Sequence, residues 1–140
     1  MSIYFHKEDR DVPLFNKIKV VSVVKDFCSE REMMAGDINF IYCSDEYLLE
    51  MNKNFLNHDF YTDVITFNNN EGNIVSGDIF MSRDRIEENA VNFESEVEDE
   101  FIRVCAHGLL HLLGMNDAGE EEKAKMREQE DIFIKRVKLM

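Results

Sequence analysis

Two histidines four residues apart, His107 and His111, lie within an otherwise apolar stretch of the chain. Apolar residues recur around them at helical spacing and predict a helix that begins near Ser95 and ends at Gly114. Residues four apart on a helix differ by only about 40° in direction and about 6 Å in height. Both imidazoles can therefore reach one ion from the same face of this helix.

The residues after this helix supply a third candidate ligand. Gly114 can adopt the left-handed conformation that ends a helix, which lets the chain fold back and deliver Asp117. Three protein ligands leave one position for water, as in catalytic zinc sites. We therefore predict that His107, His111 and Asp117 bind one divalent ion, with zinc as the expected metal. The alternative is a pair of core histidines satisfied by backbone or carboxylate partners.

The residues between the two histidines restrict the chemistry of such a site. The zinc-protease pattern H-E-x-x-H places its general-base glutamate where this chain has Gly108, so peptide hydrolysis is disfavoured. Two histidines and one carboxylate are also the ligand set of non-haem iron oxygenases, which leaves that class as an alternative. A carboxylate ligand also improves the relative suitability of the site for manganese or iron.

Hydrophobic periodicity predicts both strands and helices within one domain over residues 1–140, which contain no linker or repeat. Strands are expected at 2–6, 38–43, 64–67 and 74–81, the last two as an antiparallel hairpin. Helices are expected at about 13–30, 46–55, from 82 onward, 95–113 and 120–137. The first should bury Leu14, Ile18, Val21, Val24 and Cys28, the third Ile86, Ala90 and Phe93, and the last should be a solvated amphipathic helix.

Charge and cysteine content limit the partners and the compartment. The chain has 29 acidic residues against 16 lysines and arginines, a net charge of −13, which disfavours loose coating of nucleic acid but leaves a local grip possible. No apolar run approaches the ~20 residues that cross a bilayer, and no signal peptide is evident. With 3 widely spaced cysteines, a disulfide framework is not expected. We expect a cytoplasmic protein without membrane contact.

Residues 107–117 resemble the H-G-x-x-H-x-x-G-Y-D-H signature of the YbeY family, and two further blocks extend the likeness. Residues 51–67 are similar to the family's L-N-x-x-Y-R-x-x-D-x-x-T-D-V-L-S-F segment, and residues 77–79 to its G-D-I strand. The resemblance implies one α+β domain, a small mixed sheet packed by helices, with the metal site on a helix and the turn after it.

The same resemblance implies an activity and partners. It predicts a zinc-dependent endoribonuclease, a hydrolase whose metal-bound water attacks a phosphodiester of single-stranded RNA. The implied roles are rRNA maturation and ribosome quality control, and the implied partners are rRNA or the ribosome, with a ribosomal or assembly protein as a further partner.

Two positions depart from the family pattern. Asp117 replaces the third histidine, and Leu56 replaces an arginine that would offer a bidentate grip on phosphate. His58 and Arg103 are the candidate substitutes for this contact; alternatively Arg103 pairs with Glu100 or Asp99 and His58 is merely exposed. Leu56 also favours a second hypothesis, in which the protein is a metal-containing ribosome assembly factor without catalytic turnover.

Two aspartates are candidates for holding a metal-binding imidazole in the right tautomer, as carboxylates beside metal sites commonly do. They are Asp63 and Asp78. Each also has a structural interpretation, in which Asp63 caps a turn at a strand entry and Asp78 lies at a strand kink beside Gly77.

Overall fold

A four-stranded mixed sheet with strand order β1-β2-β4-β3 forms the centre of the fold. The computed structural model describes residues 2–57 and 62–139. The strands are β1 (Ile3–Lys7), β2 (Met34–Cys43), β3 (Val64–Asn68) and β4 (Ile74–Ser82). β1 and β4 each pair in parallel with β2, whereas β3 and β4 form an antiparallel pair. The predicted hairpin is therefore confirmed, and β3 is left at an edge of the sheet.

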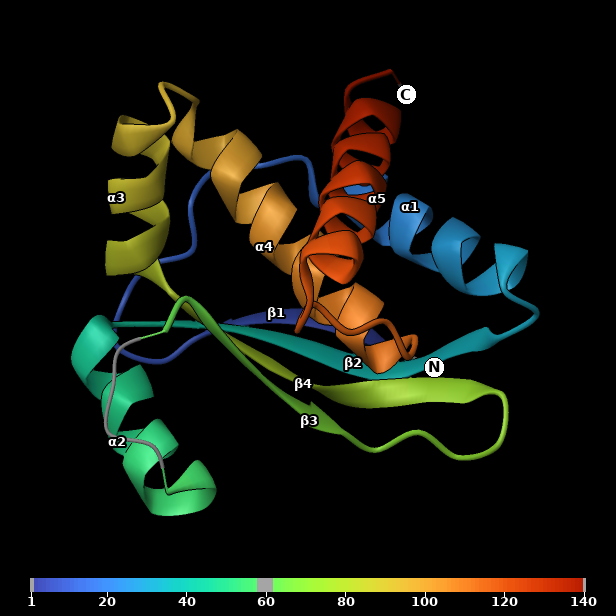
Figure 1. Ribbon diagram of the computed structural model, residues 1–140, viewed down its shortest axis with the longest axis horizontal. Coiled ribbons are helices and arrows are strands. Elements are labelled where there is room, and N and C mark those ends of the chain that lie inside the picture. The colour runs from blue at the N-terminus through green and yellow to red at the C-terminus, as the bar shows by residue number, and fades with distance from the viewer. Residues whose placement is uncertain (1, 58–61, 140) are drawn as a thin grey trace.

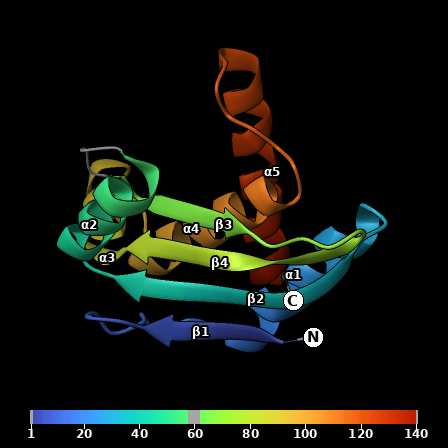
Figure 2. The same cartoon turned by 90° about the horizontal axis from the view of Figure 1, so that it is seen from below.

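Five helices are seen in the described residues, and they cover the two faces of the sheet unequally (Figure 1). They are α1 (Lys17–Glu30), α2 (Asp45–Leu56), α3 (Arg83–Asn92), α4 (Val97–Leu112) and α5 (Glu120–Leu139). Helices α1, α3, α4 and α5 lie on one side of the sheet, and α2 lies on the other. Figure 2 shows the same arrangement turned by 90°. The α+β class and the mixed sheet packed by helices are as predicted.

The first helix begins later than predicted, and its buried face overlaps the predicted one only at Val24 and Cys28. Asn16 caps it by accepting a hydrogen bond from the backbone N–H of Lys19 at 3.1 Å. Leu14 and Ile18, which we expected in the core, are 95% and 83% exposed. The buried residues also follow helical spacing and are Val20, Val23, Val24, Phe27 and Cys28. Two apolar stripes overlap in this sequence, and only packing against β2 and α5 decides between them.

Phe93 is a second correction, because it is 60% exposed rather than part of the inner face of α3. The helix ends at Asn92, and Phe93 is its C-terminal cap with φ −100°. The residue therefore falls outside the helical period that places Ile86 and Ala90 in the core.

Helix α4 lies close against β4 because two glycines remove side chains from the contact. A Cβ at Gly108 would lie 2.5 Å from Cγ2 of Ile79. A Cβ at Gly77 would meet the carbonyl oxygen of Phe67 and the side chain of Leu112. This close approach fixes the height of α4 over the sheet and places its histidines beside the β3 edge.

Two further properties concern the cysteines and the apolarity of the helices. Cys28, Cys43 and Cys105 are free and buried, so the three thiols act as small core residues. Within residues 2–57 and 62–139, no helix combines the length and apolarity that a bilayer crossing requires.

Candidate metal centre

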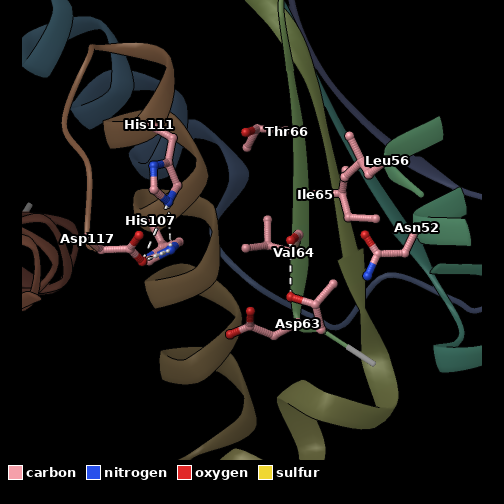
Figure 3. A pocket seen from close by; sticks show the side chains of 10 residues that line it. Asn52, Leu56, Asp63, Val64, Ile65, Thr66, His107, His111 and Asp117 are labelled. Atoms are coloured by element: carbon pink, nitrogen blue, oxygen red, sulfur yellow. Dashed lines mark hydrogen bonds and ion pairs between the residues drawn. The ribbon is translucent and has the colours of Figure 1, made fainter. Parts of the chain in front are cut away.

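The structure brings His107, His111 and Asp117 together at the end of α4 (Figure 3). The Nε2 atoms of the two imidazoles lie 3.0 Å apart. One carboxylate oxygen of Asp117 lies 3.3 Å from Nε2 of His107 and 3.8 Å from Nε2 of His111. All three predicted ligands thus present a donor atom to one point, with side chains that remain partly open to solvent.

Gly114 makes this convergence possible in the predicted way. Its φ of +96° is the left-handed conformation that glycine adopts without strain. The Gly114 N–H donates to the His111 carbonyl at 3.0 Å and the Met115 N–H to the Leu110 carbonyl at 3.0 Å, which is a Schellman ending. The chain therefore reverses direction and returns Asp117 to the face that carries the histidines.

The other ring nitrogens fix which atom of each imidazole faces the centre. Nδ1 of His111 lies 3.0 Å from the Met115 carbonyl, which can only accept, so this nitrogen donates. Nδ1 of His107 donates to the carboxylate of Glu130 at 2.7 Å. In the neutral rings both Nε2 atoms are then unprotonated, and two lone pairs converge with a carboxylate oxygen. Such a set of donors fits a divalent cation, which removes the repulsion between them.

Glu130 is the contact that sequence reasoning missed, because α5 was interpreted as a solvated helix. Glu130 is only 5% exposed. Burial by itself lowers the pKa of His107, but the hydrogen bond and charge of Glu130 outweigh it and raise that pKa above its ordinary value. A signal existed in the sequence: Glu130 lies on the apolar stripe formed by Met126, Phe133 and Val137, where an unpaired charge would be unfavourable.

Arg103 is occupied by carboxylates rather than open to a phosphate. Its guanidinium donates to Glu130 at 3.0 Å and to Asp131 at 2.6 Å, and Glu100 lies 3.8 Å from its Nε. Arg103 therefore does pair with Glu100, as the alternative interpretation predicted, but its shorter contacts are to Glu130 and Asp131 on α5. Arg103 holds Glu130, and Glu130 in turn holds His107. The other predicted phosphate contact, His58, lies outside the described residues.

The two candidate aspartates differ in position. Asp63 lies at the entry to β3, beside the imidazoles in Figure 3, where burial raises the pKa of its carboxyl and His107 partly offsets that effect. Asp78 accepts a hydrogen bond from Asn39 at 3.0 Å, and strand alternation turns it to the sheet face opposite α4. The structure does not bring Asp78 to the imidazoles, whose Nδ1 partners are Glu130 and the Met115 carbonyl.

Two clefts meet at the three donors. The first, here called the edge cleft, has a volume of about 520 Å³ and runs along β3. It is lined by Asn52, Leu56, residues 62–66, His107, His111 and Asp117. The second, called the α5 cleft, has a volume of about 360 Å³ and shares Asp63, His107 and Asp117 with the first. An extended ligand could therefore reach a cation at this junction through either cleft.

Leu56 lies across the edge cleft from the imidazoles, with β3 between them (Figure 3). Its side chain is 41% exposed, so it offers an apolar surface where the family pattern has an arginine. Among the described residues, no lysine or arginine lines the edge cleft.

The comparisons with known proteins agree along nearly the whole chain. The family model described as Endoribonuclease YbeY matches residues 2–138. The chain is 45% identical over 134 residues to Endoribonuclease YbeY of Cytophaga hutchinsonii, covering 95% of this chain and 94% of the relative. It is 42% identical over 131 residues to the protein of the same name from Parabacteroides distasonis, covering 94% and 92%. The solution structure of TM1509 from Thermotoga maritima superimposes with a TM-score of 0.63 at 27% identity, covering 97% of this chain and 89% of the other.

Proposed function

The chain belongs to the YbeY family, and on that premise we propose that it is a metal-dependent endoribonuclease that cuts single-stranded RNA during rRNA maturation. The observation that carries the proposal is the convergence of two imidazole Nε2 atoms and one carboxylate oxygen where two open clefts meet. We extend it to ribosome quality control, and to residues 1–140 acting as one metallohydrolase domain.

The donor set indicates how the site would work. Nε2 of His107, Nε2 of His111 and a carboxylate oxygen of Asp117 would hold one divalent ion, for which we propose zinc. When bound, the ion supplies Lewis acidity and a water molecule whose pKa is brought toward neutrality. Glu130 and the Met115 carbonyl keep both imidazoles oriented, so the donors need little rearrangement.

The charge of the chain suggests how RNA is reached. At −13, the protein repels a phosphate backbone at long range, so free RNA should bind weakly and in a salt-dependent manner. We therefore propose that a ribosomal or assembly protein helps to recruit it to rRNA or the ribosome. We propose the cytoplasm as its compartment, in keeping with such a substrate and with three free thiols.

Metal analysis and cleavage of defined RNA test the proposal together. Protein purified without chelator should contain about one divalent ion per chain, as three ligands and an open position require. It should cut an unstructured oligoribonucleotide faster than a duplex, lose this activity with EDTA, and regain it with zinc. A protein that carries metal yet never cuts RNA above a chelated control would contradict an endoribonuclease. Iron with oxygen consumption would instead indicate the oxygenase alternative.

Glu130→Gln is expected to weaken metal binding about 10- to 100-fold with little change in fold, because an amide accepts from Nδ1 of His107 without a negative charge. Competition with a chromophoric chelator measures the affinity. Asp131→Asn is the matched control, because Asp131 contacts Arg103 without touching a histidine in the described structure. Equal effects of the two substitutions would show that Glu130 does not act through His107.

One observation favours the second candidate, a metal-containing assembly factor without turnover: the edge cleft presents Leu56 where the family pattern has arginine. Leu56→Arg should then separate the two functions. In an enzyme whose rate is limited by this loss, it should raise RNA cleavage about tenfold, since a charge-assisted contact to the phosphate is regained. Stability should change by less than about 0.5 kcal/mol at this partly exposed position.

Cleavage rates at saturating metal measure the effect of Leu56→Arg, and Leu56→Gln controls for polarity without charge. An assembly factor would show no cleavage in either variant. In that case its binding to ribosomal particles would be the activity to measure.

A further inference from the structure

The α5 cleft is chemically different from the edge cleft, although both reach the metal donors. Figure 1 shows α4 between α3 and α5, and residues from all three helices line the cleft. Its outer walls include Asn89 and Phe93 at the end of α3 and Lys123 and Arg127 on α5. His107 and Asp117 form its inner end. A ligand in this cleft would therefore lie directly beside the metal centre.

Two of the lining residues are cations available for a ligand. Lys123 and Arg127 are both exposed, and within the described part of the chain neither has a carboxylate in ion-pairing contact. Elsewhere, many basic side chains are paired with acids, as Arg85 is with Asp45 and Arg136 with Glu30. In a chain with a net charge of −13, two available cations beside a metal centre create a local site for an anion.

Four acidic side chains also line the α5 cleft, and three of them contact an arginine or an imidazole. Glu100 and Glu130 both contact Arg103, which compensates part of their charge. Asp117 faces the two imidazoles, and Asp63 lies at the junction with the edge cleft. Arg103 therefore offsets two of the acids beside the metal donors, whereas Lys123 and Arg127 are lining cations without a carboxylate contact in the described residues.

An exposed aromatic ring adjoins the two cations. Phe93 is 60% exposed, and its ring centroid lies 5.7 Å from Cζ of Arg127. A cation near an aromatic face is attracted by the ring and holds it in place. A ring of this kind beside basic residues is how proteins without sequence preference bind single-stranded nucleic acid, since every base has a face that can stack.

We propose that the α5 cleft binds the nucleotide of single-stranded RNA next to the cleaved phosphodiester. The ring of Phe93 stacks on its base, while Lys123 and Arg127 contact backbone phosphates. This inference rests on the proposed function and deepens it, because it moves the grip on the substrate from the Leu56 side of the site to α5. It also explains how an acidic protein can retain RNA at its metal centre.

Binding is tested with a phosphorothioate oligoribonucleotide that resists hydrolysis, about 12 nucleotides long to span the site. Fluorescence anisotropy with the protein as purified gives the Kd. Phe93→Ala should weaken binding about tenfold because stacking is lost, whereas Phe93→Tyr should stay within about twofold of wild type. Val91→Ala, at a 77% exposed position in the last turn of α3, controls for loss of apolar surface.

The cations have a separate signature in the salt dependence. The double variant Lys123→Gln/Arg127→Gln should reduce the slope of log K against log salt by about 1.4, the value for two lost phosphate contacts to a single strand. Lys25→Gln, an exposed lysine on α1 at the far side of the core, should leave binding unchanged. Circular dichroism checks that each variant is folded, which is expected for substitutions at exposed positions.

The outcomes separate the inference from the proposed function. If the wild type binds and cuts RNA while all three α5-cleft variants behave like it, the inference is overturned and the proposed function stands. A wild type that carries metal but neither binds nor cuts RNA would overturn both. Weakened binding by Phe93→Ala with retention by Phe93→Tyr, together with the reduced salt slope, supports the inference.

Discussion

His111→Ala is expected to abolish metal binding and RNA cleavage together while leaving the fold intact. Binding of zinc by a complete protein site is worth about 10–16 kcal/mol, so losing one of three ligands should remove about 4 kcal/mol, a factor on the order of 10³ in affinity. The side chain of His111 is 26% exposed, and its hydrogen bond in the described structure is to the nearby Met115 carbonyl. Its removal should therefore change the free energy of unfolding by only about 1 kcal/mol.

Metal content by mass spectrometry and cleavage of an unstructured oligoribonucleotide measure the two effects of His111→Ala. His6→Ala is the matched control, because His6 lies in β1 and contacts Asn39 at 2.8 Å, away from the metal donors. Retention of one ion per chain and wild-type cleavage by His111→Ala would refute the three-ligand site. Loss of metal with retained cleavage would refute the metal-dependent mechanism alone.

Gly108→Glu is expected to unfold the protein rather than convert it into a peptidase. The substitution completes the H-E-x-x-H pattern in sequence, but Gly108 faces β4 in the structure, not the metal donors. A side chain there meets Ile79 at once, and its carboxylate would be buried without a partner. Overpacking and burial of the charge together should exceed about 5 kcal/mol, which is comparable with the whole stability of a domain.

A smaller side chain at position 108 tests the same contact with Ile79 if the Gly108→Glu variant does not fold. Gly108→Ala should lower the free energy of unfolding by about 1–3 kcal/mol in urea titrations. Ile79→Ala alone should lower it by about 2–5 kcal/mol by leaving a cavity. Combined, the two should lose less than their sum, because the new methyl group enters the vacated space. An increase in stability by Gly108→Ala, as an ordinary helical glycine would give, would contradict the close contact.

Much of the centre could be predicted because its signals are local in sequence. The spacing of His107 and His111 sets their common face, and Gly114 sets the reversal that returns Asp117, all within one segment. The hairpin of β3 and β4 was predictable for the same reason. In each case the contacting residues are close in the chain, so the periodicity of the helix or strand determines which side chains meet.

Contacts between distant segments were where sequence reasoning failed. Asp78 is one of two sequence candidates for holding an imidazole, but strand alternation turns it to the opposite face of the sheet. Arg103 was considered for phosphate, but two acids on α5 occupy it. The buried face of α1 was predicted correctly only at Val24 and Cys28, because two apolar stripes satisfy the same spacing. None of these choices is encoded in the local pattern, since each depends on which element packs against which.

The amino-acid sequence by itself determined the three donor residues, the turn that joins them and the class of chemistry they permit. Only the tertiary structure decided that Glu130 holds His107, that Arg103 supports Glu130, and that Phe93 faces a cleft with Lys123 and Arg127. The physical reason is that hydrogen bonds and ring contacts act over a few ångströms in space. Residues 23 positions apart in the chain, as His107 and Glu130 are, come within that range only when the core has packed α5 against α4.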